Sequence, residues 1–296
     1  MAVNTVKATL NGQTYNLTYN SSTKAYEATI TAPSKSSYNQ TNHVYGITVV
    51  ATDTAGNSTT IDSGNATYGA QLKLKVTEST KPVITVTYPT NNAVLTSTDT
   101  PTISWKVTDA DSGVNASTIT LKIDGTAVSS SDITKTNSSG TYTCTCVKTL
   151  SQGAHTLVFE VTDNDGNKQT STISIKVDTV PPTLNISSPS GNITTNVTNL
   201  TVSGYTNDAN SSPVTLTVNG SATTVQSNGY FETTVALTEG SNKITVVATD
   251  ASGLTTTVER TVKLDTKAPK FTSVTCTPNP VGVGGQFKIS FNVTDE

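Results

Sequence analysis

Apolar and polar residues alternate along much of this chain, most clearly in three similar segments. Each segment has an alternating strand, a four-residue turn that contains glycine, and a second strand. The segments are VVATDTAGNSTT (49–60), FEVTDNDGNKQT (159–170) and VVATDASGLTTT (246–257). A period of two places alternate side chains on one face of a strand. The pattern therefore predicts three β-hairpins.

An aspartate and a glycine occupy equivalent positions in the three predicted turns. We expect the aspartate to accept backbone N–H bonds at the start of the turn and the glycine to take the position with positive φ. The aspartates are Asp53, Asp163 and Asp250, and the glycines are Gly56, Gly166 and Gly253.

A further strand and then a proline follow each hairpin, in LKVTESTKP, IKVDTVPP and VKLDTKAP. Proline cannot donate to a strand ladder, so these segments are expected to join domains. Aligned on Pro82, Pro182 and Pro269, the repeats are spaced by 100 and 87 residues, which suits seven-stranded sandwiches. The sequence predicts an extended multi-domain rod. The expected domains are 1–78, 79–178 and 179–265, followed by a two-strand half domain, 266–296.

The composition favours an all-β fold and argues against several classes of function. Thr and Val, which fit a pleated, half-buried surface, are abundant, and no window shows helical apolar spacing. The net charge is −3 and Lys and Arg do not cluster, which argues against nucleic-acid binding. The longest apolar runs have strand length, so no membrane insertion is expected. Cys144 and Cys146 lie two apart on one strand, are poorly placed to bond each other, and are expected to be reduced.

Both terminal segments carry parts of a domain. The second and third domains place the hairpin of LKIDG (121–125) or LTVNG (216–220) after two earlier strands, whereas the first domain begins directly with VKATLNG. Residues 266–296 supply two such strands, and ISFNVTD there matches ISWKVTD in the second domain. The inner face of this half domain would carry the predicted interface residues Ile289, Phe291 and Val293. Burial of each of these side chains stabilises by about 1.5–3 kcal/mol.

We therefore expect another set of strands to cover that face. The leading hypothesis is head-to-tail strand addition, in which the half domain completes the first domain of a neighbouring copy. Such a heterologous contact yields a ring or a filament. The alternatives are completion by a different partner, closure onto the first domain of the same chain, and a sequence cut out of a longer protein.

The third domain carries the motifs of a known family. Residues 214–253, VTLTVNG…VQSNGYFETTVALTEGSNKITVVATDASG, resemble bacterial immunoglobulin-like domains of the type named for glucodextranase domain B. The hallmarks are the VNG hairpin, an aromatic strand, an EGxNxI turn and ATDxxG. The second domain keeps a degraded form, LSQGAHTLVFEVTDNDGN (150–167), and the first keeps LNG, AYEATI and VVATDTAGN. The resemblance implies the fold. Such modules occur in adhesins, accessory parts of enzymes and phage tails alike.

Four aspartates are candidate calcium ligands: Asp109 and Asp111 in TDADSG, with Asp163 and Asp165 in TDNDGN. They resemble the acidic loops by which cadherin-like modules hold Ca²⁺, an ion that takes six to eight oxygen ligands. Turn capping is the favoured interpretation, because it explains Asp163 without a metal and the third domain lacks the second aspartate. No cofactor is predicted.

No catalytic residues are predicted. His43 and His155 are the only imidazoles, and neither lies in a Ser-His-Asp order. His155 aligns with Asn242 of the third domain and is expected to be a solvated turn residue. Trp105 occupies an alternating strand position that predicts a core aromatic, and Cys144 is expected to point inward.

The predicted function is structural rather than enzymatic. Stacked sandwiches space or decorate something else, and MAVNTVKATL shows no signal segment. The leading interpretation is a virion component, such as a tail protein, of a phage or phage-like particle. It would assemble in the host cytoplasm from copies of itself or with other virion proteins, and bind surface polysaccharide through many weak contacts. The alternatives are a bacterial cell-surface adhesin or stalk, and a spacer or carbohydrate-binding part of a secreted glycan-degrading enzyme.

Overall fold

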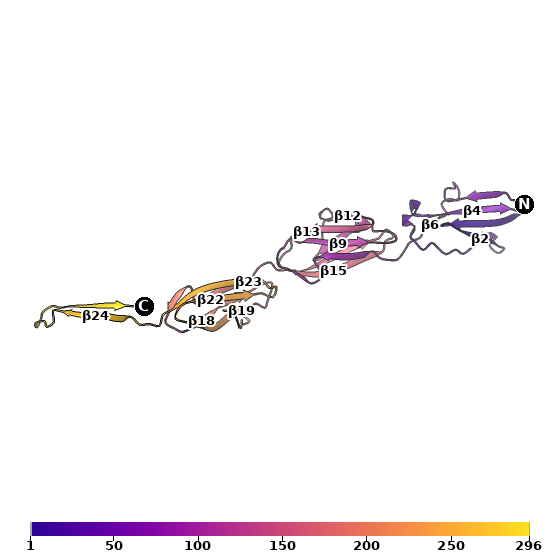
Figure 1. The fold of residues 1–296 in the computed structure, drawn as a ribbon. Coiled ribbons are helices and arrows are strands. Elements are labelled where there is room, and N and C mark those ends of the chain that lie inside the picture. The colour runs from indigo at the N-terminus through magenta and orange to yellow at the C-terminus, as the bar shows by residue number, and fades with distance from the viewer. Residues whose placement is uncertain (1, 296) are drawn as a thin grey trace. The chain divides into compact units, whose positions relative to one another are not determined.

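The computed structural model describes residues 2–295, which form β-strands joined by turns and short 3-10 segments (Figure 1). Strands make up nearly all of the regular structure among these residues, which confirms the all-β fold class predicted from the composition. The chain divides into two compact units, Met1–Val177 and Asp178–Glu296. Within residues 2–295, no helix has the length and apolar character needed to cross a bilayer.

The first unit begins with a sheet called the head sheet here, in the order β3-β2-β1-β4-β5, with β6 paired to β4. Its strands are β1 (Val3–Leu10), β2 (Gln13–Asn20), β3 (Ala25–Glu27), β4 (Tyr45–Asp53), β5 (Ser58–Ile61) and β6 (Lys73–Leu74). The 3-10 segments η1 (Ser37–Asn39) and η2 (Thr41–His43) precede β4. Every described strand of the head belongs to this sheet, so the head has one layer of strands.

A complete sandwich follows in the same unit and is called the second sandwich. One sheet has the order β11-β10-β14-β15-β8 and the other β12-β13-β9-β7. Its strands are β7 (Val83–Tyr88), β8 (Ala93–Leu95), β9 (Thr102–Thr108), β10 (Thr120–Ile123), β11 (Thr126–Ala127), β12 (Thr134–Ser138), β13 (Thr141–Val147), β14 (Gly153–Thr162) and β15 (Lys168–Val177). The 3-10 segments are η3 (Ala116–Thr118) and η4 (Ser130–Asp132).

Alternating residues of the two sheets form the core of the second sandwich. Trp105 on β9 packs against Phe159 on β14 with ring centroids 5.1 Å apart, so the predicted core aromatic is confirmed. Cys144 and Cys146 on β13 are buried free thiols, which confirms the inward direction predicted for Cys144. Burial raises the pKa of the Cys144 thiol to about 11, although nearby Lys135 opposes the shift. This thiol is therefore protonated and unreactive at neutral pH.

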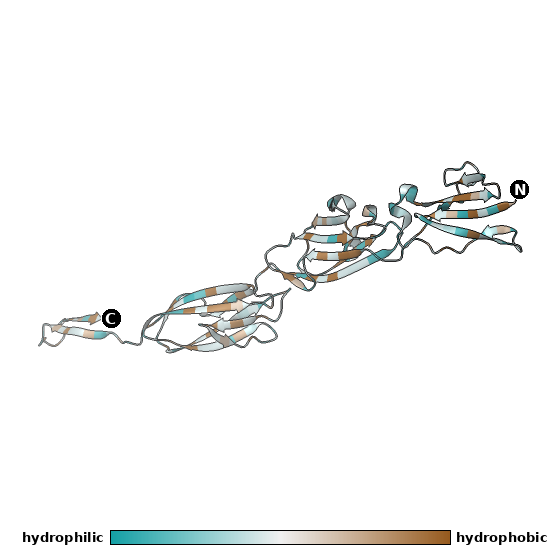
Figure 2. Ribbon diagram, turned by 45° about the vertical axis from the view of Figure 1, so that its right-hand side comes forward, coloured by the Kyte–Doolittle hydropathy of each residue, from teal (hydrophilic) through white to brown (hydrophobic). Residues whose placement is uncertain are grey.

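The third sandwich lies in the second unit and has sheets in the orders β16-β18-β21 and β17-β23-β22-β19-β20. Its strands are β16 (Thr183–Ser188), β17 (Ile193–Thr195), β18 (Asn199–Asn207), β19 (Thr215–Val218), β20 (Ser221–Thr223), β21 (Tyr230–Ala236), β22 (Gly240–Thr249) and β23 (Thr255–Leu264). Phe231, Val202 and Ile244 are central in its core. Apolar and polar bands alternate along the strands of both sandwiches (Figure 2).

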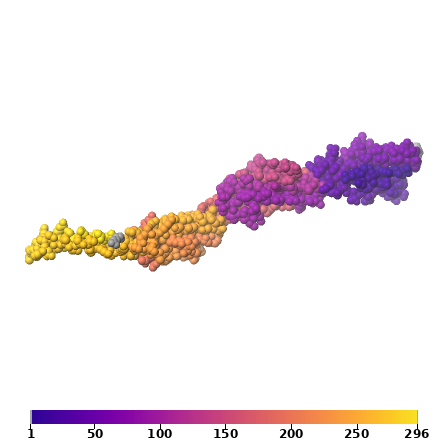
Figure 3. All heavy atoms as spheres, viewed as in Figure 1, coloured from indigo at the N-terminus to yellow at the C-terminus, as the bar shows by residue number. Residues whose placement is uncertain are grey.

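The second unit also contains a two-stranded hairpin called the tail hairpin, formed by β24 (Lys270–Thr277) and β25 (Lys288–Thr294). Among the described residues, these strands pair only with each other. The space-filling view shows their visible face uncovered (yellow in Figure 3). The tail hairpin therefore lacks the second sheet that gives the two sandwiches a core.

The predicted hairpin turns form as expected. Oδ1 of Asp53 accepts the backbone N–H groups of Ala55 and Asn57, and Oδ1 of Asp250 accepts those of Ser252 and Leu254. The turn glycines have positive φ, at 91° for Gly56, 98° for Gly166 and 88° for Gly253. The repeated aspartate and glycine thus satisfy the backbone of each turn.

The prediction for His155 is wrong, because this side chain is buried rather than solvated. Its Nδ1 lies 2.7 Å from the Asp124 carboxylate and its Nε2 lies 2.8 Å from the Ser151 carbonyl. Burial by itself would lower the pKa of His155, but the two hydrogen bonds and the Asp124 charge outweigh it and raise the pKa. Both ring nitrogens face acceptors, so the folded state favours the imidazolium.

We predict that the second sandwich loses stability as the pH rises through the raised pKa of His155. A folded-state pKa above the unfolded value of about 6.5 gives a contribution that is fully present below that pH and is lost above the folded pKa. Guanidinium unfolding followed by the fluorescence of Trp105, the only tryptophan, should show a lower midpoint at pH 8 than at pH 6.

The matched control is His155→Asn, because Asn242 at the equivalent place in the third sandwich donates to the carbonyl oxygens of Thr238 and Gly240. This variant should lose most of the difference between the two midpoints. An equal difference in both proteins would contradict the assignment to His155.

Candidate functional site: acidic clusters and an uncovered hairpin

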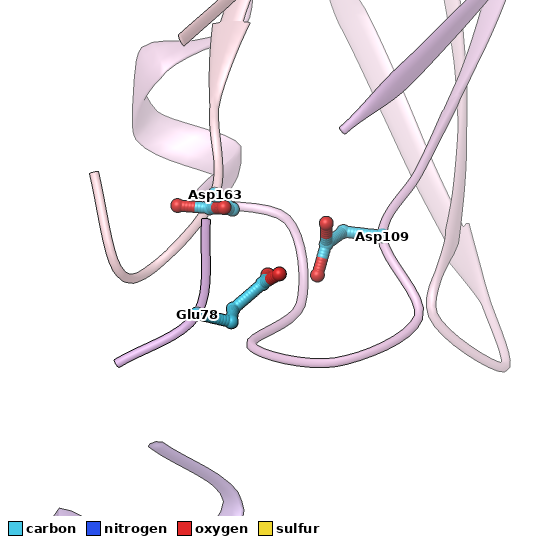
Figure 4. A group of neighbouring side chains, drawn as sticks. All are labelled: Glu78, Asp109 and Asp163. Atoms are coloured by element: carbon cyan, nitrogen blue, oxygen red, sulfur yellow. The ribbon is translucent and has the colours of Figure 1, made fainter. Parts of the chain in front are cut away.

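Three carboxylates meet in the first unit at the start of the second sandwich. Glu78 precedes β7, Asp109 directly follows β9, and Asp163 directly follows β14. One carboxylate oxygen from each lies within 4.8 Å of the other two. Figure 4 shows the Glu78 carboxylate directed toward the space between Asp109 and Asp163. Oxygen ligands gathered in this way suit a hard cation such as calcium.

Hydrogen bonds already occupy the carboxylates of this first cluster. Asp109 Oδ1 accepts the N–H groups of Asp111 and Gly113, and Asn167 donates to both oxygens of Asp163. Glu78 accepts from the Ser112 hydroxyl and from Thr80 N–H. The hydrogen bonds to Asp109 and Asp163 are the turn-capping contacts that the sequence favours for these two aspartates.

The structure brings together only part of the aspartate set considered in the sequence. Asp109 and Asp163 are cluster members, whereas Asp111 and Asp165 contact the backbone that precedes the second sandwich. Asp111 Oδ1 accepts from Ser36 N–H at 3.1 Å, and Asp165 Oδ2 accepts from Glu78 N–H at 3.0 Å. These two carboxylates link the head and its following segment to the turns of the second sandwich.

A second cluster occupies the equivalent positions of the second unit. Asp178 stands four residues before Pro182, as Glu78 does before Pro82. Asp208 follows β18, and Asp250 follows β22. The three carboxylates again have one oxygen each within 4.8 Å of the others. They are more deeply buried than the first set, with exposed fractions of 0% for Asp178 and 5% for both Asp208 and Asp250.

The two clusters differ in how the turn aspartate is hydrogen bonded. Asn167 donates its side-chain amide to Asp163 Oδ2, but Leu254 occupies that position in the third sandwich. As a result, Asp250 Oδ2 is buried and has no hydrogen-bond partner within the described part of the chain. A buried carboxylate oxygen without a partner is unfavourable.

Sequence reasoning missed Glu78, Asp178 and Asp208. A signal was available for Glu78 and Asp178 in the segments that join the domains, called joints here. In each joint an acidic residue stands four positions before the aligned proline. These side chains meet the hairpin turn only in three dimensions, so their spacing along the chain resembles no metal motif.

The tail hairpin carries the predicted interface residues on an exposed face. Ile289, Phe291 and Val293 are 50%, 55% and 49% exposed, whereas Ile103, Trp105 and Val107 at the matching positions of β9 are at most 1% exposed. Phe271, Val274 and Cys276 of β24 lie opposite the three β25 residues and share their face. The Phe271 and Phe291 rings confirm this, with centroids 5.7 Å apart.

Strand β4 of the head sheet is less completely covered than the equivalent strands of the two sandwiches. Along β4 the residues from Ile47 to Asp53 are all half-buried, whereas alternate residues of β14 and β22 are fully buried. In the sandwiches, β13 pairs with β9 and β21 pairs with β18. The head counterpart, β3, ends at Glu27, and residues 28–36 form no strand. The segment that would pair with a β9-type strand is thus left irregular.

Comparison with known families supports this fold in both complete sandwiches. Residues 182–266 match the family model described as glucodextranase, domain B. Residues 82–158 match that of a bacterial Ig domain.

Curated relatives match parts of the chain. Chitinase ChiA of Flavobacterium johnsoniae is 28% identical over 207 residues, which cover 64% of this chain and 13% of the chitinase. Bacillopeptidase F of Bacillus subtilis is 31% identical over 137 residues, which cover 46% of this chain and 9% of that protein. The chain therefore spans only about a tenth of the length of these relatives.

Similar solved structures include a titin I-band fragment, 13% identical with a TM-score of 0.48, covering 89% of this chain and 88% of that one. Fibronectin(III)-like modules of Clostridium thermocellum CbhA are 19% identical with a TM-score of 0.33. The match covers 62% of this chain and 94% of that one. The family matches and the paired sheets together establish tandem immunoglobulin-like sandwiches.

We predict that Asp165 and Asp111 each protect one backbone amide. Asp165→Ala removes the acceptor for Glu78 N–H, and loss of this part-buried hydrogen bond to a charged group is worth about 1–3 kcal/mol. Hydrogen exchange of the Glu78 amide should therefore accelerate roughly 5- to 150-fold, as followed by NMR or mass spectrometry.

Asp111→Ala is the matched variant and should accelerate exchange at Ser36 instead. Each variant should leave the other amide near its original rate. Unchanged exchange at both amides would show that these hydrogen bonds do not hold in solution.

Proposed function

We propose that this chain is a non-catalytic structural spacer whose tail hairpin completes the head sheet of a second copy by strand addition. The observation that carries the proposal is the exposed apolar face of the tail hairpin, whose counterparts in the second sandwich form the core. The proposed contact is head-to-tail, and its partner is another copy of the same chain.

The repeat specifies how the hairpin would dock. In the second sandwich, β7 pairs with β9 and β9 pairs with β13. By equivalence, β25 would pair with β3 and the irregular residues that follow it, in an antiparallel register. Phe291 would then take the place of Trp105, facing the apolar side of the head sheet.

The energies support a contact that uses the whole face. Burial of each large apolar side chain contributes about 1.5–3 kcal/mol. Association of two molecules costs roughly 4–15 kcal/mol. Several buried side chains and the added strand hydrogen bonds are therefore needed together, so loss of one central side chain should abolish the contact.

A head-to-tail contact can repeat along a series of copies, because a copy that has docked its tail hairpin still has a free head sheet. Such a series suits the tail or another virion component of a phage or phage-like particle, and equally a stalk on a bacterial surface. Many copies in a row would also let weak contacts with surface polysaccharide act together.

A second candidate function is a spacer within a larger enzyme. The matches to a chitinase and to a bacillopeptidase favour it, because the chain corresponds to a small part of each protein. In that setting the tail hairpin would be completed by further residues of the same polypeptide, and the sandwiches would hold other domains apart.

We predict that the chain associates head-to-tail and that Phe291→Asp prevents it, since a charge on the inner face cannot be buried unpaired. Light scattering should give masses above that of one chain for the original protein and the mass of one chain for the variant. Asn292→Asp is the matched control, because Asn292 lies next to Phe291 on the opposite face of β25 and should tolerate the same charge.

Cys276 provides an independent measurement. It is an exposed thiol on the inner face of the tail hairpin, so docking should slow its alkylation at least about tenfold relative to Phe291→Asp. A single-chain mass at all concentrations with a fully reactive Cys276 would refute strand addition. A single-chain mass with a protected Cys276 would instead indicate closure within one chain.

A further inference from the structure

We propose that Asp178, Asp208 and Asp250 bind a calcium ion in the third sandwich. The inference is independent of strand addition, because all three residues belong to the second unit and none lies in the tail hairpin. It rests on two observations: the three carboxylates lie close together, and one buried oxygen of Asp250 has no hydrogen-bond donor among the described residues.

The spacing of the oxygens fits one ion. Calcium–oxygen distances are roughly 2.3–2.6 Å, so ligands on opposite sides of the ion are about 5 Å apart. Three carboxylate oxygens that all lie within 4.8 Å of one another can therefore contact the same ion.

The burial of the carboxylates favours a cation. Three side chains that are ionised in water lie close together with at most 5% of their surface exposed. Buried charges are generally paired or coordinate metals, because removal from water is unfavourable and like charges repel. A divalent cation would compensate both effects at once.

Asp250 shows which oxygen is available. Its Oδ1 accepts the N–H groups of Ser252 and Leu254, at 2.8 and 2.9 Å. Its Oδ2 is buried and receives no hydrogen bond from residues 2–295. In the other two turns, an asparagine side chain donates to this oxygen: Asn57 to Asp53 and Asn167 to Asp163. Leu254 removes that donor only in the third sandwich.

The remaining contacts hold the other two carboxylates in place. Asp208 Oδ1 accepts the N–H groups of Asn210 and Ser211 at 2.8 and 2.6 Å. The Ser252 hydroxyl donates to Asp178 Oδ2 at 2.6 Å. An ion bound here would tie Asp178 to the turns that follow β18 and β22.

The chemistry favours calcium over magnesium. Calcium accepts several carboxylates in a flexible arrangement, whereas magnesium requires near-octahedral geometry, retains waters and is usually held by one or two carboxylates. Three converging carboxylates with hydroxyl groups beside them match the ligands that calcium prefers.

The test is isothermal titration of the full chain with CaCl₂, after chelator treatment and dialysis into metal-free buffer. We expect binding with a Kd of about 10⁻⁵–10⁻³ M and weaker binding of MgCl₂. Asp250→Asn should reduce the number of bound calcium ions by one. Asp53→Asn changes the equivalent turn residue outside any cluster of the described residues and should leave binding unchanged.

Leu254→Asn keeps all three carboxylates and restores the missing hydrogen-bond donor. Weaker calcium binding by this variant therefore cannot be attributed to misfolding caused by the loss of a carboxylate. The new amide should donate to Asp250 Oδ2, as Asn57 and Asn167 do to their aspartates, and weaken calcium binding at this site about tenfold or more. The proposal is overturned if 10 mM calcium, on the order of ten times the weakest expected Kd, leaves the original protein metal-free by equilibrium dialysis. It is also overturned if folded Asp250→Asn binds as many ions as the original, if Leu254→Asn binds calcium equally well, or if magnesium binds more tightly.

Discussion

A β-sheet with one apolar face needs a second layer, and this requirement governs the whole chain. Where two sheets meet, as at Trp105 and Phe159, the side chains are almost fully buried. Where one layer is missing, the same kinds of residue remain exposed, as Phe291 does. Burial of apolar area is the largest favourable contribution to folding, so the exposed face of the tail hairpin lacks the main stabilisation that the two sandwiches have.

The repeat made much of this fold predictable. Alternation with a period of two identifies strands, and the Asp–Gly turns fix where each hairpin reverses, so the all-β fold and the inward positions of Trp105 and Cys144 followed from sequence alone. His155 was mispredicted because its equivalent, Asn242, is a polar turn residue. The carboxylate of Asp124, which comes from another strand connection, creates the buried partner that no local pattern displays.

The acidic clusters also depend on contacts between distant parts of the chain that no local sequence pattern displays. The turn aspartates were recognisable because a turn is local, but each cluster also needs a residue from the joint and one from the end of another strand. The two clusters differ in the hydrogen bonding of the turn aspartate, and one position causes this difference. The Asn167 side chain donates to Asp163, whereas the Leu254 side chain cannot donate to Asp250. A substitution that looks like ordinary turn variation thus changes a satisfied hydrogen-bond network into a buried oxygen that lacks a donor.

The repeated acidic positions also connect the clusters with the uncovered hairpin. Asp265 stands four residues before its joint proline, and Asp295 directly follows β25, so the tail hairpin carries the first two positions of a cluster. The head sheet carries the third, Asp53, with Asn57 donating to its Oδ2. Strand addition would therefore bring Asp265 and Asp295 close to Asp53 of the partner subunit. Because the asparagine is present there, that composite cluster would be hydrogen bonded like the first one, and head-to-tail contact would not require calcium.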